Sequence, residues 1–175
     1  MRTLLAVLFV CAADAAAAVS ARCELPEAHL HARLAGAVDD ELDWSGSQMG
    51  CEGMPRADGG IRLRFTGRGR SGPVDVVFGV PALAEGASGR ALPVNLTLIL
   101  GGGRVFGTRG ADRCTLDEVR QVSVTDAAGA RRWRVDGRGF CLAPARAVGA
   151  DDAVLVSTFE FTGVVARDAD GSPAP

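Results

Sequence analysis

Sulfur and imidazole side chains lie close together in the first third of the chain. Cys51 lies between Met49 and Met54 in the segment QMGCEGMPRADGG, and the two histidines, His29 and His31, precede it. Thioether, thiolate and imidazole groups are ligands that copper favours. A copper or other metal site built from these five residues is therefore one hypothesis for the chemistry of this segment.

The cysteine count favours a different role for Cys51. The first 21 residues, MRTLLAVLFVCAADAAAAVSA, combine an early arginine, an apolar run and small residues, which is typical of a secretory signal peptide. Cleavage after residue 21 would remove Cys11 and leave an even set of four cysteines. These four are Cys23, Cys51, Cys114 and Cys141. Because secretion leads to an oxidising compartment, we expect two disulfides.

Four cysteines allow three pairings, of which we favour Cys23 with Cys51 and Cys114 with Cys141. Each pair would close a contiguous loop of about 30 residues, and the loop-entropy model gives such a loop about 3.5 kcal/mol of stabilisation. A copper site would instead need a free thiolate, and Arg33 beside the histidines would repel a cation. The disulfides are the preferred interpretation, and the metal site is the alternative.

Arginine supplies every basic side chain, because the chain contains no lysine. Two segments, 62–70 and 131–138, are rich in arginine and poor in acidic residues. Guanidinium groups bind phosphate, sulfate and carboxylate groups through paired hydrogen bonds. The candidate anion-binding residues are Arg62, Arg64, Arg132 and Arg134. The alternative interpretation is that outward arginines keep sheet edges soluble and prevent edge-to-edge pairing.

Patterns for catalysis and nucleotide binding are weak. Residues 67–72 match G-x-G-x-x-G, but Pro73 and a further strand follow, whereas a dinucleotide needs a helix N-terminus there. We therefore expect a loop. Nucleophilic catalysis needs an oriented base, and the two histidines are expected on a solvent-facing side of a strand. The acidic run at 39–43 is interpreted as a solvated loop. We expect no enzymatic activity and no cofactor.

Strands should position these residues, because apolar and polar side chains alternate along much of the chain. Alternation is clear at 61–66, 74–80, 96–100, 118–125, 131–142 and 154–165. In the last segment we expect Leu155, Phe159 and Phe161 to point inward. Residues 30–38 fit a helix or a strand, and we favour a strand. The sequence predicts an all-β fold: an antiparallel β-sandwich or small barrel of about eight strands, reinforced by disulfides.

The predicted organisation is a signal peptide at 1–21, one β domain at 22–166 and a disordered tail at 167–175. A formal net charge of -2 gives no electrostatic reason to expect nucleic-acid binding, and no segment predicts a transmembrane span. We expect a bacterial, periplasmic or secreted binding or interaction module. Its expected partner is an anionic glycan or an envelope protein, and the alternative is a periplasmic metal-binding protein.

Overall fold

A computed structural model describes residues 23, 25–81, 83–110, 113–127 and 129–166. The predicted signal peptide and the predicted C-terminal tail lie outside these residues. The described part of the chain contains eleven strands and two short 3-10 turns, and it contains no α-helix. The predicted all-β, antiparallel class is confirmed, whereas the strand number is eleven rather than about eight.

All strands belong to one antiparallel sheet. They are β1 (His29–Gly36), β2 (Asp40–Ser45), β3 (Gly50–Pro55), β4 (Ile61–Gly69), β5 (Gly72–Val80), β6 (Gly89–Leu100), β7 (Arg104–Gly107), β8 (Cys114–Thr125), β9 (Arg131–Cys141), β10 (Ala145–Ala147) and β11 (Ala153–Val165). The 3-10 turns are η1 (Gly46–Gln48) and η2 (Gly101–Gly103). The alternating segments at 118–125 and 131–142 form a hairpin, in which β8 pairs with β9.

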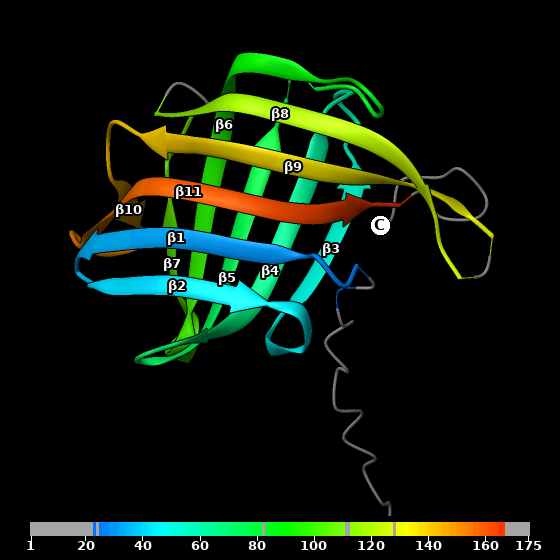
Figure 1. Cartoon of the computed structure of the whole chain (residues 1–175). Coiled ribbons are helices and arrows are strands. Elements are labelled where there is room, and N and C mark those ends of the chain that lie inside the picture. Colours follow the sequence, from blue (N-terminus) through cyan, green and yellow to red (C-terminus); the bar gives the residue numbers. More distant parts are fainter. Residues whose placement is uncertain (1–22, 24, 82, 111–112, 128, 167–175) are drawn as a thin grey trace, which may run out of the picture.

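The sheet folds over on itself into two layers (Figure 1). The front layer contains β8, β9, β11, β1 and β2, and its strands cross those of the rear layer, which contains β3, β4, β5, β6 and β7. Strand β6 connects the layers, because its residues 89–94 pair with β8 and its residues 95–100 pair with β5. Strand β10 makes a second connection by pairing with both β11 and β7. The result is a flattened barrel.

Aromatic rings fill the space between the layers. Phe65, Phe78, Phe159 and Phe161 are almost completely buried, and the ring centroids of five pairs among them lie 4.8–6.4 Å apart. Glycines on neighbouring strands make room for these rings. A Cβ atom on Gly137, which is paired directly with Phe161, would overlap the Phe161 ring. The core therefore depends on large rings packed against glycine backbone.

A close contact between β2 and β4 closes the barrel on one side. The Trp44 ring lies directly against Gly67, and its Nε1 donates a 2.9 Å hydrogen bond to the carbonyl oxygen of Arg68. Asp40 accepts a 2.8 Å hydrogen bond from the backbone N–H of Arg70. The expectation of a loop at 67–72 holds only for residues 70–71, because Gly67 and Gly69 lie in β4, where they admit the β2 side chains, and Gly72 begins β5.

Two other local expectations need correction. The acidic run at 39–43 is mostly strand β2, in which Asp40, Leu42 and Trp44 point inward. In β11, Val154 and Val156 are buried while Leu155 is only partly buried. The strand pairing shifts register between Val156 and Thr158, opposite Arg33 and Leu34, so a β-bulge changes which side chains face the core. Leu155 therefore does not belong to the inward set that contains Phe159 and Phe161.

Two disulfides reinforce the barrel, with the pairing that the sequence favoured. Cys23 is bonded to Cys51, with 4.7 Å between their Cα atoms, and this bond ties the segment before β1 to β3. Cys114 is bonded to Cys141, at a Cα separation of 3.9 Å, and joins the first residue of β8 to the last of β9. Two disulfides fit a protein that folds outside the cytoplasm. Within the described ranges, no helix is both long and apolar enough to cross a membrane.

Candidate functional site

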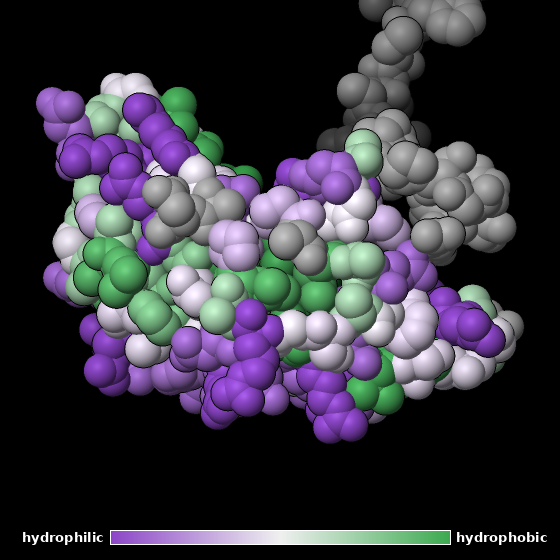
Figure 2. Space-filling view, turned by 90° about the horizontal axis from the view of Figure 1, so that it is seen from above, coloured by the Kyte–Doolittle hydropathy of each residue, from purple (hydrophilic) through white to green (hydrophobic). Residues whose placement is uncertain are grey.

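Hydrophilic side chains border the molecule on both sides when it is seen from above, and more hydrophobic residues form a band between them (Figure 2). Depressions lie on the outer surfaces of both layers. A further, mainly apolar depression of ≈ 550 Å³ lies between Leu25 and Val124, and its two charged residues, Asp126 and Arg132, form a 2.7 Å ion pair with each other. The two depressions on the outer surfaces carry more varied chemistry.

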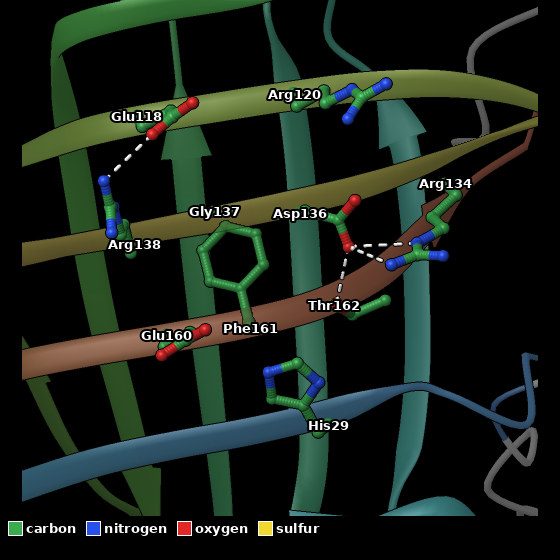
Figure 3. A pocket seen from close by; sticks show the side chains of 10 residues that line it. All are labelled: His29, Glu118, Arg120, Arg134, Asp136, Gly137, Arg138, Glu160, Phe161 and Thr162. Carbon is green, nitrogen blue, oxygen red and sulfur yellow. Dashed lines mark hydrogen bonds and ion pairs between the residues drawn. The ribbon is translucent and has the colours of Figure 1, made fainter.

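The front depression has a volume of ≈ 370 Å³ and lies over β8, β9, β11 and β1 (Figure 3). Its lining includes three arginines, three carboxylates and one histidine. These residues are Arg120, Arg134, Arg138, Glu118, Asp136, Glu160 and His29. Strand pairing brings them together, because outward residues of neighbouring strands lie opposite one another. The arrangement alternates positive and negative groups across the layer.

Most of the charge in the front depression is neutralised internally. Arg134 lies 3.0 Å from a carboxylate oxygen of Asp136, which also accepts a 2.6 Å hydrogen bond from the Thr162 hydroxyl. Arg138 forms a 3.0 Å ion pair with Glu118. These contacts appear as dashed lines in Figure 3. Because the guanidinium groups of Arg134 and Arg138 already have carboxylate partners, an incoming anion would have to compete for them.

The rear depression has a volume of ≈ 360 Å³ and a different charge balance. Its described lining residues are Arg56, Arg62, Val77, Gly79, Asn95, Thr97 and Ile99, and this set includes two arginines and no carboxylate. Register places Arg62 of β4 opposite Gly79 of β5, and Gly79 opposite Asn95 of β6. Gly79 has no side chain, and a Cβ atom there would lie 3.0 Å from Nη1 of Arg56. The Arg56 guanidinium therefore extends over the sheet surface.

Asp58 fixes the orientation of the Arg56 guanidinium. Both residues belong to the turn between β3 and β4. Nε and Nη2 of Arg56 donate to the Asp58 carboxylate over 2.6–3.1 Å, and the backbone N–H of Gly60 donates to the same carboxylate over 3.1 Å. Nη1 of Arg56 takes no part in this contact. It is the part of the guanidinium that lies above Gly79.

The hydrogen bonds to Asp58 change its proton affinity. Those from Arg56 are the largest cause, followed by that from Gly60, and together they lower the pKa of Asp58 from 3.8 to about 2. The hydrogen bonds to Asp58 also raise the pKa of Arg56 above its ordinary value. Because the pKa of Asp58 is lower in the folded protein than in the unfolded chain, the stabilisation from this contact is fully present above the pKa of the unfolded chain. It is lost as the pH falls through about 2. The Arg56–Asp58 pair is therefore expected to persist through mildly acidic conditions.

An NMR titration of the side-chain carboxyl carbon of Asp58 tests this expectation. We predict a midpoint near pH 2 in the native protein. In Arg56→Ser, the largest cause of the shift is removed, so the midpoint should move up toward the ordinary aspartate value of about 3.9. An unchanged Asp58 midpoint in Arg56→Ser would contradict the described contact.

Arg62 and Arg64 are neighbours on the outer side of β4 but differ in their partners. Arg64 lies 3.2 Å from Glu52 and 2.6 Å from Asp75, and the hydrogen bond to Asp75 is the main cause of its raised pKa. Arg62 forms no ion pair or side-chain hydrogen bond with any residue in the described part of the chain. Its guanidinium is thus available to a ligand, whereas that of Arg64 is held by two carboxylates.

The four arginines singled out from the sequence do not form one cluster. Arg62 and Arg64 lie on β4 in the rear layer, whereas Arg132 and Arg134 lie on β9 in the front layer. Arg132 is paired with Asp126, and Arg134 is paired with both Glu27 and Asp136. Of the four, only Arg62 lines the rear depression. Its neighbour there, Arg56, was not among the residues selected from the sequence.

The residues of the metal hypothesis are divided between the two layers. His29 and His31 lie on β1 of the front layer, and Nε2 of His31 is 3.7 Å from Glu41. Met54 lies on β3 of the rear layer, and Met49 is buried just before that strand. Cys51 is bonded to Cys23 rather than present as a thiol. Among the described residues, no group of three or more His, Cys, Asp and Glu side chains is arranged to hold a metal ion.

Strand pairing creates the rear depression, which explains why the sequence did not reveal it. Arg56 lies about 40 positions before Asn95 and Thr97, and these residues come together only through the register of β4, β5 and β6. The sequence offered only two local signals of this site. Asn95 and Thr97 fall at outward-facing positions of a strand, and Gly79 is a single glycine within a strand. Comparison with known proteins found no matching family model, no matching curated protein and no matching solved structure.

Proposed function

We propose that this protein is a non-enzymatic binding module of the periplasm or the extracellular space that recognises an anionic group in its rear depression. One observation carries the proposal: two guanidinium groups, from Arg56 and Arg62, line a depression in which no carboxylate is found among the described lining residues. An anion entering there would gain charge-assisted hydrogen bonds without displacing an internal partner of Arg62. The signal-like first 21 residues and the two disulfides support an extracytoplasmic location.

The other lining residues suit an organic anion better than a bare inorganic ion. Asn95 and Thr97 carry side-chain groups that both donate and accept hydrogen bonds, so they are able to bind hydroxyl groups. Val77 and Ile99 offer apolar surface to the carbon skeleton of a ligand. A sulfated or uronic sugar combines these features. Because the chain as a whole carries a charge of -2, the attraction must be local rather than a property of the whole molecule.

Binding to a sulfated disaccharide, measured by calorimetry at low ionic strength, tests the proposal. Removal of one charge-assisted hydrogen-bonding partner costs about 1.5–3 kcal/mol, so Arg62→Ser should weaken binding by roughly tenfold or more. Arg68→Ser is the matched control, because Arg68 is also exposed on β4 but does not line the depression. This control should bind like the native protein.

Salt dependence and folding complete the test. Affinity should fall as salt is added, since exposed charges are screened over about 10 Å at 0.1 M ionic strength. Circular dichroism should show that every variant keeps the β-sheet spectrum. If the folded native protein does not bind the disaccharide at low salt, the proposal fails. Equal losses in Arg62→Ser and Arg68→Ser would also contradict it, because the depression would then have no special role.

A further inference from the structure

An open path continues from the rear depression across the outer surface of the sheet. Thr97 of β6 lies opposite Gly107 of β7, and Gly107 lies opposite Arg146 of β10. The path therefore runs from Arg62 over Gly79, Asn95, Thr97 and Gly107 to Arg146. It crosses five neighbouring strands in the order β4, β5, β6, β7 and β10.

Small side chains keep this path open. Gly107 has no heavy atom of a described residue within 4 Å of the position that a Cβ would take, so none of these residues fills the space above it. Gly79 contributes no side chain of its own, and Asn95 and Thr97 are short. Adjacent strands are about 4.8 Å apart, so the four steps from β4 to β10 correspond to roughly 19 Å along the sheet surface. A ligand of that length would follow the path and would meet the Arg56 guanidinium over Gly79.

Positive charge is present at both ends of the path. Arg146 is exposed, and its side chain makes no ion pair or hydrogen bond with other residues that the structure describes. Arg62, at the opposite end, is likewise exposed and without an ion pair or side-chain hydrogen bond to a described residue. The Arg56 guanidinium, which Asp58 orients, lines the depression beside it. The four residues between these ends are uncharged. The chemistry of the path thus matches an extended ligand that carries repeated negative groups.

We infer that the ligand of the rear layer is a linear polyanionic polysaccharide that spans the path from Arg62 to Arg146. This inference rests on the proposed function and adds a second contact, at Arg146, to the anion site at Arg56 and Arg62. A chain that reaches both ends gains affinity because its second contact forms within the bound complex. The uncharged Asn95 and Thr97 provide hydrogen-bonding groups for sugar hydroxyls between the charged ends.

The polar and glycine residues along the path distinguish this ligand from a single-stranded nucleic acid. Proteins that bind single strands stack the bases on aromatic side chains. None of the six path residues, from Arg62 to Arg146, is aromatic. A polysaccharide needs no such platform when its charges and hydroxyl groups are bound by guanidinium, amide and hydroxyl side chains. The polysaccharide is therefore the better match, and a nucleic acid becomes an alternative outcome of the test.

Calorimetry with two sulfated oligosaccharides tests the inference. A disaccharide is too short to reach from Arg62 to Arg146, whereas a decasaccharide is long enough. The native protein should bind the decasaccharide at least tenfold more tightly than the disaccharide. The Arg146→Ser variant should lose most of the additional affinity for the decasaccharide. It should bind the disaccharide as tightly as the native protein does. Arg62→Ser should weaken both complexes, and Arg131→Ser, an exposed arginine of β9 away from the path, should change neither.

Each outcome has a separate meaning. Absence of disaccharide binding by the native protein overturns the proposed function and, with it, the inference. The disaccharide could bind while Arg146→Ser still binds the decasaccharide as tightly as the native protein does. That result would support the anion site but contradict the second contact at Arg146. A single-stranded oligonucleotide of similar length that binds as tightly as the decasaccharide, with the same loss in Arg146→Ser, would overturn the polysaccharide assignment. Weak oligonucleotide binding that is insensitive to Arg146→Ser supports it.

Discussion

Trp44→Ala should lower the free energy of unfolding by about 3–5 kcal/mol, which is the usual cost of truncating a buried aromatic side chain. Trp44 is only 5% exposed, and its ring packs against Gly67 where β2 meets β4. The alanine variant would leave a cavity at this closure of the barrel and remove the hydrogen bond to the Arg68 carbonyl. Urea denaturation followed by circular dichroism measures the change.

Two matched variants separate packing from hydrogen bonding at this closure. Trp44→Phe keeps most of the ring volume but loses the Nε1 donor, so it should lose clearly less stability than Trp44→Ala. Gly67→Ala places a methyl group in the space that the ring of Trp44 occupies and should also destabilise the protein. A loss below about 1 kcal/mol for Trp44→Ala, the level typical of surface positions, would mean that β2 does not close the barrel as described.

Removing the disulfide between Cys114 and Cys141 should cost about 3.5 kcal/mol, from the entropy of the loop that it closes in the unfolded chain. The two cysteines are 27 positions apart and join the ends of the paired strands β8 and β9. We expect the double variant Cys114→Ser/Cys141→Ser to unfold at a clearly lower urea concentration than the native protein. Non-reducing peptide mapping by mass spectrometry should show the linkage itself.

Reduction provides a control for the disulfide prediction. The native protein in a strong reductant loses both disulfides, so it should be at least as unstable as the double serine variant. A Cys114→Ser/Cys141→Ser protein that unfolds at the same urea concentration as the native protein would contradict the prediction. Peptides that join Cys23 to Cys114 or Cys51 to Cys141 would contradict the pairing that the structure describes.

Local patterns predicted the architecture where each strand has one buried and one exposed side. Residues 61–66 and 74–80 alternate cleanly, and Phe65 and Phe78 are buried in β4 and β5 as expected. The segment at 30–38 also fitted a helix, and the choice of a strand is confirmed by β1. These positions are predictable because the two-residue period follows directly from the pleat of a strand.

Contacts between distant residues were not predictable from the same patterns. The acidic residues of β2 suggested a solvated loop, because nothing local shows that Asp40 is buried against Gly69 and bonded to the backbone of Arg70. The short strands β7 and β10 contain too few residues to show a period. The rear depression depends on register across several strands, and register is set by turns and packing that the sequence does not display.

Guanidinium NMR tests the central claim, that the rear depression binds an anion, most directly. Nη–H signals of arginines would be followed while a sulfated disaccharide is added at low ionic strength, with assignments from Arg56→Ser and Arg62→Ser. We predict that the signals of Arg62 and Arg56 shift together and saturate, because both guanidinium groups line the depression. The signals of Arg134 and Arg138, which are paired in the front depression, should stay in place. Saturable shifts of Arg134 and Arg138 with unchanged signals of Arg56 and Arg62 would contradict the claim.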